Sequence, residues 1–223
     1  MSKNENMTVA ILDSGIGGVA VLKQIIAKYK YGNYIYFADN LNMPYGNKNK
    51  LWLKKRLIDI IEWLKDEFNI KHIIIACNTA STVLKEIDIP NVIKMKYDET
   101  KTYYATKLTK SNMPAINVVA DNTLAKQIEK HILNKKLLMC IIKKHIKQHR
   151  LNEKEEFVLG CTHYELVEKL FKKYCPKSNV ICNSSFMLND INLQIKQKEL
   201  NIIVKLSKED EDIKNKIRKL LNG

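Results

Sequence analysis

Two short segments of this chain share one design, and they constrain its fold more than any other feature. Residues 73–81 read IIIACNTAS and residues 157–164 read FVLGCTHY, so each apolar run ends in a small residue, a cysteine and polar side chains. A short apolar run bounded by polar residues is typical of a buried strand in a parallel sheet. Ligands bind at the carboxyl ends of such strands. The two segments therefore predict that Cys77 and Cys161 flank one ligand.

The hydrophobic pattern predicts alternating strands and helices along the chain. The predicted strands are 8–12, 34–38, 71–76, 91–95, 115–120, 157–160, 179–182 and an edge strand at 200–205. The predicted helices are 19–29, 51–68, one from 79, 96–112, 124–131, one within 133–150, 165–174 and 208–221. This alternation is typical of parallel sheets with helices outside them.

Polar residues follow strand ends in both halves of the chain, which predicts two similar lobes that face one cleft. The expected fold class is α/β, with two pseudo-symmetric lobes, parallel-type sheets flanked by helices, and the active site between them. The first lobe is expected to comprise residues 1–95 and 190–223, and the second residues 96–189.

The net charge of +14 raises the question of an anionic partner. The lysines are spread along the whole chain, which indicates a solvated coat, so we expect no nucleic-acid partner. The most basic segment is KKHIKQHR at 143–150. No apolar run is long enough to span a membrane, and MSKNEN at the N-terminus does not resemble a signal peptide. We therefore expect a cytoplasmic protein without a membrane partner.

The five cysteines do not form a disulfide framework, because their number is odd and their spacing is wide. We expect reduced thiols. There is no CxxC pair and no His/Cys spacing suited to zinc, so the sequence predicts no metal. Cys140, Cys175 and Cys182 are interpreted as packing residues.

Two thiols beside one ligand suit proton transfer at carbon. An acyl-transfer enzyme needs one nucleophile, whereas proton abstraction from both faces of a carbon needs two bases. A helix N-terminus or a neighbouring cation makes a thiolate available near neutral pH. One thiolate and one thiol that exchange roles are the arrangement of a cofactor-free racemase or epimerase, in which Asp13 and His163 could steer the protons.

Four segments together resemble a known family. DSGIGG at 13–18, PYG at 44–46, ACNTAS at 76–81 and GCTHY at 160–164 resemble the signature segments of glutamate racemase, in the family's order. The resemblance implies interconversion of L- and D-glutamate without pyridoxal phosphate or another cofactor. It also implies that D-glutamate goes to peptidoglycan synthesis, that the partner is the small-molecule substrate glutamate, and that a homodimer can form.

The resemblance also implies roles for individual residues. Cys77 resembles the base that acts on D-glutamate and Cys161 the base that acts on L-glutamate. Asp13 resembles the helper of Cys77, and His163 the helper of Cys161. The positions that match substrate-binding residues are Ser14, Pro44, Tyr45, Gly46, Asn78, Thr79, Thr123 and Thr162.

The second lobe departs from the family pattern. It is shorter by about a helix, and the family has a segment there that ends in a glutamate near the active site. The corresponding residues here, 140–150, contain no acidic side chain, so His145 or His149 is the candidate replacement.

Three other functions fit parts of the pattern. A racemase for aspartate or another acidic amino acid would keep the same thiol pair. A catalytically weak or inactive family member could act as a binding or regulatory protein. A cysteine hydrolase would depend on Cys161 but not on Cys77.

Overall fold

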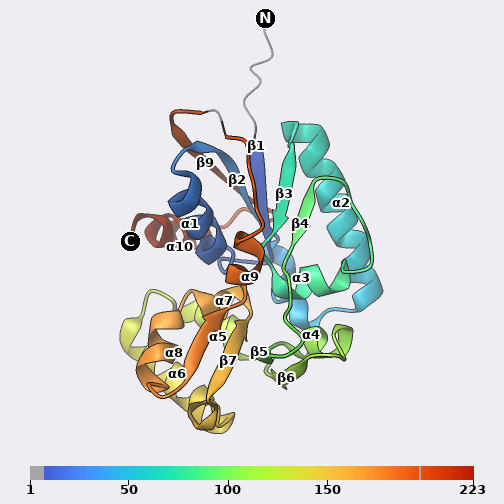
Figure 1. The fold of residues 1–223 in the computed structure, drawn as a ribbon. Helices are drawn as coiled ribbons and strands as arrows, with labels where there is room; N and C mark the ends of the chain where they lie inside the picture. Colours follow the sequence, from blue (N-terminus) through green and yellow to red (C-terminus); the bar gives the residue numbers. More distant parts are fainter. Residues whose placement is uncertain (1–7, 196) are drawn as a thin grey trace, which may run out of the picture.

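The computed structural model describes residues 8–195 and 197–223, which form two sheets covered by helices (Figure 1). The first sheet has the strand order β4-β3-β1-β2-β9, and its strands are β1 (Thr8–Asp13), β2 (Gly32–Ala38), β3 (His72–Ile75), β4 (Val92–Lys94) and β9 (Leu200–Leu206). The second has the order β6-β5-β7-β8, with β5 (Thr102–Ala105), β6 (Asn117–Ala120), β7 (Glu156–Gly160) and β8 (Asn179–Cys182). All their pairs are parallel, which confirms the predicted fold class.

At least one helix follows every strand except β4, which leads directly to β5. The α-helices are α1 (Val19–Tyr29), α2 (Lys50–Phe68), α3 (Asn78–Val83), α4 (Lys107–Asn112), α5 (Leu124–His131), α6 (Lys135–Gln148), α7 (Thr162–Glu165), α8 (Glu168–Tyr174), α9 (Ser184–Leu188) and α10 (Glu211–Asn222). The short 3-10 helices are η1 (Asn40–Asn42), η2 (Tyr45–Asn47) and η3 (Leu151–Glu153).

The central strand β1 is covered on both faces. Val9 and Ile11 belong to the apolar cluster that contains the buried side of α1, whereas Ala10 and Leu12 belong to the cluster that contains the buried side of α2. Successive strand residues point to opposite faces, so both faces need apolar side chains. This explains why β1 reads as a continuous apolar run rather than an alternating one.

The two sheets meet through the elements that follow their strand ends. Helix α1 is in contact with α7, and α3 and η2 are both in contact with α4. In Figure 1 the second sheet lies below the first, and α7 and α9 lie at the junction. The carboxyl ends of β1 and β7 therefore deliver their polar residues to the boundary between the sheets.

The division into lobes at 1–95 with 190–223 and at 96–189 stays a prediction. The strands of the first sheet come from 8–94 and 200–206, and those of the second from 102–182. Residues 1–7, including the segment judged not to be a signal peptide, and residue 196 lie outside the described residues.

The predicted helix at 96–112 is wrong in its first part. Residues 102–105 form β5, which pairs with both β6 and β7, and the helix α4 begins at Lys107. Tyr103 and Tyr104 are fully buried in this strand. Aromatic residues favour strands, but this strand has only four residues and follows a polar segment, so its apolar pattern was too short to distinguish it from a helix.

The helix expected at 165–174 is α8, which begins three residues later at Glu168, and the short helix α7 precedes it. The uniform packing role given to three cysteines needs correction. Cys175 is buried, but Cys140 is exposed and Cys182 is half-buried, so Cys140 is not a packing residue. The edge position predicted for residues 200–205 is confirmed by β9, where Leu200 and Ile203 are exposed.

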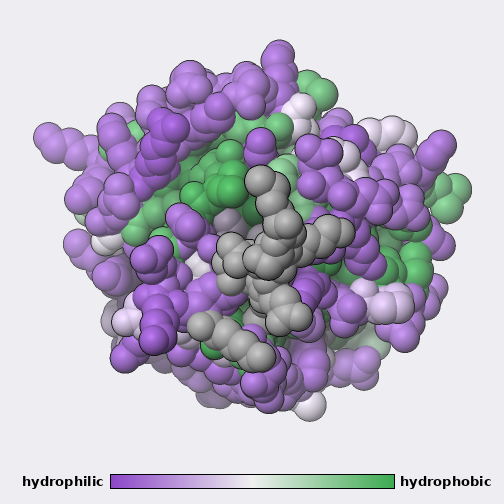
Figure 2. Space-filling view, turned by 90° about the horizontal axis from the view of Figure 1, so that it is seen from above, coloured by the Kyte–Doolittle hydropathy of each residue, from purple (hydrophilic) through white to green (hydrophobic). Residues whose placement is uncertain are grey.

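The view from above shows a mainly hydrophilic surface, with hydrophobic side chains gathered in bands between the polar ones (Figure 2). Within 8–195 and 197–223, none of the helices combines the length and the apolar character needed to cross a bilayer.

We predict that Gly160→Ala destabilises the second sheet. Gly160 pairs with Ala105, and a Cβ at Gly160 would lie 2.9 Å from the Cβ of Ala105. Overpacking of this kind typically costs about 1–3 kcal/mol. Urea unfolding should show this loss, and the double variant Ala105→Gly/Gly160→Ala should recover part of it. Equal stability of Gly160→Ala and the wild type would contradict the packing described here.

Candidate active site

The two cysteines singled out by the sequence line one cavity between the sheets. Cys77 precedes α3 at the end of β3, and Cys161 precedes α7 at the end of β7. Both are buried, with 6% and 8% of their surface exposed. The cavity has a volume of about 20 Å³, and its lining is Ser14, Pro44, Tyr45, Gly46, Cys77, Asn78, Thr79, Thr106, Ala125, Cys161, Thr162 and His163.

Most of the predicted site residues are part of this lining, but two are not. Asp13 is fully buried beneath it and contacts Thr162. Thr123 is exposed, and its backbone N–H and hydroxyl both donate to Asp121 instead. Thr106 and Ala125 line the cavity without having been predicted. They follow β5 and β6, so the missed strand explains the omission of Thr106.

Asp13 connects the glycine-rich turn after β1 with the second cysteine segment. One carboxylate oxygen accepts a hydrogen bond from the N–H of Gly15 at 2.9 Å, and the other accepts one from the Thr162 hydroxyl at 3.0 Å. Burial raises the pKa of Asp13, although the positive charge of His163 and these hydrogen bonds oppose the rise. Burial and the nearby charge of Asp13 also raise the pKa of Cys77, whose thiol lies 4.0 Å from the Ser14 hydroxyl.

His163 lies between Cys161 and a carboxylate that the sequence analysis missed. Its Nε2 is 2.6 Å from Oε2 of Glu129 on α5, and the same oxygen accepts a hydrogen bond from the N–H of Ile16 at 3.1 Å. Burial acts to lower the pKa of His163, but hydrogen bonds with Cys161 and Glu129 outweigh it and raise this pKa well above its usual value. The surroundings of His163 thus favour its protonated form beside Cys161.

Glu129 also explains the glycine in the turn after β1. A Cβ at Gly15 would lie 2.7 Å from Oε2 of Glu129.

The expectation that His145 or His149 approaches the active site is not met, because both contact Asp121 and neither lines the cavity. Glu129 belongs to no recognised motif, and the fold of α5 alone brings it to His163, so its role had no local sequence signal.

Hydroxyl and amide groups surround the thiols. The Thr79 and Thr106 hydroxyls are 3.1 Å apart. The side-chain oxygen of Asn78 accepts hydrogen bonds from Tyr97 and Asn183, whereas its Nδ2 is buried without a partner among residues 8–195 and 197–223. Because an unpaired buried donor is costly, this amide is available to an acceptor such as a ligand carboxylate.

Comparison with known proteins agrees with the geometry. A glutamate racemase of Buchnera aphidicola subsp. Schizaphis graminum is 31% identical over 92% of this chain and 91% of its own length. A crystal structure of a glutamate racemase isoform from Bacillus anthracis has a TM-score of 0.78 at 21% identity, and covers 97% of this chain and 94% of its own. The structure of Escherichia coli glutamate racemase in complex with L-glutamate and an activator has a TM-score of 0.75 at 19% identity. It covers 96% of this chain and 95% of its own. No family model matches the sequence.

Two parallel sheets with a pair of cysteines in the cavity between them, together with these relatives, place the protein among the racemases, which are isomerases. The extent and identity of the first match define the group more narrowly. The chain belongs to the glutamate racemase family.

The buried Glu165 at the end of α7 should make the stability of the fold pH-dependent. Burial raises the pKa of its carboxyl from 4.5 to about 7, although hydrogen bonds from Ser184 oppose the rise. The folded protein then holds a proton that the unfolded chain has released, so the stabilisation is complete below about pH 4 and is lost as the pH rises through about 7.

As the pH rises from about 4 to about 7, we therefore expect the free energy of unfolding of the wild type to fall by about 3 kcal/mol relative to that of Glu165→Gln. Urea unfolding at several pH values measures this difference. The exposed-carboxylate variant Glu155→Gln is the control and should follow the wild type. A constant difference between wild type and Glu165→Gln across the range would contradict the shifted pKa.

Proposed function

We propose that this chain interconverts L- and D-glutamate by moving the α-proton between Cys77 and Cys161, without a cofactor. The observation that carries the proposal is the presence of both thiols in the lining of one cavity between the sheets. Family membership supports the reaction, and two related structures were solved with D-glutamate and with L-glutamate, respectively. The product D-glutamate would supply peptidoglycan synthesis.

The proton transfer balances between the two sulfurs. From D-glutamate, a Cys77 thiolate takes the α-proton and becomes a thiol, which leaves a carbanion at Cα. The Cys161 thiol then gives its proton to the opposite face and becomes a thiolate. L-Glutamate reacts in the reverse direction, so each turnover exchanges the protonation states of the two cysteines.

Asp13 and His163 are assigned as the helpers of the two thiols. Burial and Asp13 raise the pKa of Cys77, so this thiol is protonated in the free protein. The α-ammonium of a bound amino acid would add a positive charge beside Asp13 and Cys77, and would thereby favour the thiolate. On the other side, the hydrogen bond of His163 with Cys161 provides a path for a proton to and from that sulfur.

The polar lining suits the two carboxylates of glutamate. Ser14 and Thr79 offer hydroxyl groups, and Asn78 offers the unpartnered Nδ2, whereas the Thr162 hydroxyl in the same lining already donates to Asp13. Hydrogen bonds to charged groups are among the stronger ones, so these donors would hold the carboxylates while Cα lies between the thiols.

Either cysteine should be indispensable for full racemisation. We expect Cys77→Ala and Cys161→Ala to lower the rate by at least about 10²- to 10⁴-fold, the usual contribution of a positioned acid or base. Proton NMR in heavy water would follow the α-proton of L- and D-glutamate, each with reduced protein and no cofactor. Cys140→Ala, which removes an exposed thiol, is the matched control and should retain activity.

Other outcomes of the same experiment favour other functions. Faster exchange with aspartate than with glutamate would indicate a racemase for the shorter acid. Loss of activity in Cys161→Ala but not in Cys77→Ala would contradict the two-base mechanism and favour a hydrolase. A folded protein that exchanges neither acid would refute the proposal and favour a binding role.

Glu129 should act as a positioning residue for His163. In Glu129→Gln the amide can still accept from Ile16, but the charge that raises the pKa of His163 is lost. We expect kcat to fall by roughly 10- to 100-fold, as for one hydrogen bond to a charged group, with a smaller change in KM. The high-pH limb of the rate profile should move to lower pH. An unchanged profile would contradict this role, and Glu155→Gln serves as the control.

A further inference from the structure

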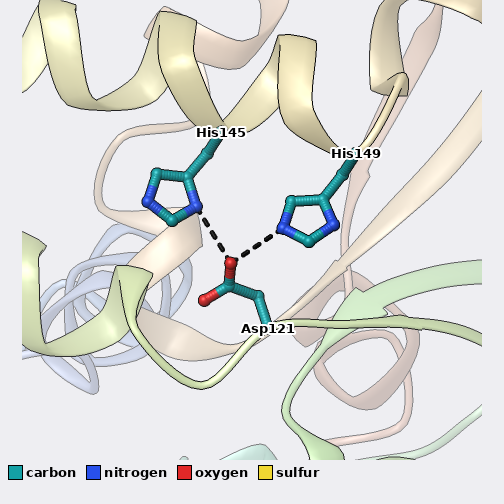
Figure 3. Close-up of side chains that lie close together, drawn as sticks. All are labelled: Asp121, His145 and His149. Carbon is teal, nitrogen blue, oxygen red and sulfur yellow. Dashed lines mark hydrogen bonds and ion pairs between the residues drawn. The ribbon is translucent and has the colours of Figure 1, made fainter.

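A second group of polar side chains lies in the second sheet, outside the thiol cavity. Asp121 follows β6, His145 lies in the last turn of α6 and His149 follows the helix directly, so that both rings point toward the carboxylate (Figure 3). The side chains are 4%, 4% and 16% exposed, respectively. None of the three lines the cavity that contains Cys77 and Cys161.

The three ligand-type atoms already converge. Nδ1 of His145 and Nε2 of His149 are each 2.9 Å from Oδ2 of Asp121, and the three atoms all lie within 4.8 Å of one another. Zinc binds imidazole nitrogen and carboxylate oxygen at about 2.0–2.2 Å, so its tetrahedral ligands lie roughly 3.4 Å apart. Small side-chain rotations would bring these atoms to that spacing without a change in the backbone.

Surrounding contacts hold the ligands in the orientation that a metal site needs. Oδ1 of Asp121 accepts hydrogen bonds from the N–H groups of Thr123 at 2.6 Å and Leu124 at 2.8 Å, which leaves Oδ2 directed at the two rings. Nε2 of His145 is 3.3 Å from the side-chain oxygen of Gln127. A hydrogen bond from the distal ring nitrogen to an oxygen acceptor is the usual outer contact of a metal-bound histidine.

We propose that Asp121, His145 and His149 bind one divalent transition-metal ion of the zinc type, through Oδ2, Nδ1 and Nε2. Two imidazoles and one carboxylate suit such an ion, and three protein ligands leave a fourth position for water. The ion would join α6 to the end of β6. This proposal replaces the sequence-based expectation of no metal. That expectation rested on the spacing of cysteines and histidines along the chain, whereas Asp121 reaches the two histidines only through the fold.

The test is zinc binding by the full chain, purified without a polyhistidine tag and treated with a chelator. Calorimetric titration should give one tight site per chain, and Zn²⁺ should raise the melting temperature. The variant His145→Asn/His149→Gln keeps an amide N–H near each position that contacts Asp121 but removes both imidazole ligands. It should lose far more affinity than the roughly 10- to 100-fold typical of a lost outer contact, and Zn²⁺ should no longer raise its melting temperature.

Two controls separate this site from the thiols. His72→Gln/His131→Asn removes histidines outside the cluster and should bind as the wild type does, and so should Cys77→Ala/Cys161→Ala. Cobalt(II) bound to the wild type should lack the near-ultraviolet thiolate-to-metal band that a cysteine ligand produces. This spectrum tests the ligand set even if the histidine variant does not fold.

Three results would overturn the proposal. If the folded wild type binds no zinc, the cluster is a hydrogen-bonded pair of histidines on one carboxylate. Alternatively, a thiolate band, or unchanged binding by the histidine variant, would assign the metal to cysteines.

Discussion

Buried carboxylates that bridge the two sheets are the interaction on which the site depends. Asp13 comes from the first sheet and accepts a hydrogen bond from Thr162 after the second, while Glu129 comes from the second and accepts one from Ile16 after the first. A buried charge is tolerated when hydrogen bonds and opposite charges surround it. Each carboxylate therefore completes its set of partners only when the two sheets are docked. The same two carboxylates help to raise the pKa of His163 and of Cys77.

The polar networks of the second sheet are connected through one short helix. Asp121 accepts hydrogen bonds from the first N–H groups of α5, and the same helix carries Glu129 to His163. His145 and His149 contact Asp121 and thereby fix the start of α5. The contacts of Glu129 fix the other end of this helix. A segment that has no recognisable motif thus links the histidine cluster to the active site.

The sequence predicted those features that have a local cause. Apolar runs that end in polar residues identify β1, β3 and β7, because buried parallel strands need both faces covered, and the residues after them identify Cys77 and Cys161 as neighbours. Strand β5 was missed because its run is only four residues long and follows a polar segment. Glu129 and Asp121 could not be assigned because their partners are distant in sequence, and only the packing of helices on the second sheet brings them together.

The small volume of the thiol cavity has a consequence for the catalytic cycle. About 20 Å³ accommodates roughly one water molecule, whereas an amino acid with two carboxylates is many times larger. A ligand of that size therefore needs a wider cavity, and widening it by separating the sheets would break the hydrogen bond from Thr162 to Asp13 and the one from Ile16 to Glu129. Ligand entry by this route would also expose these two buried carboxylates to water.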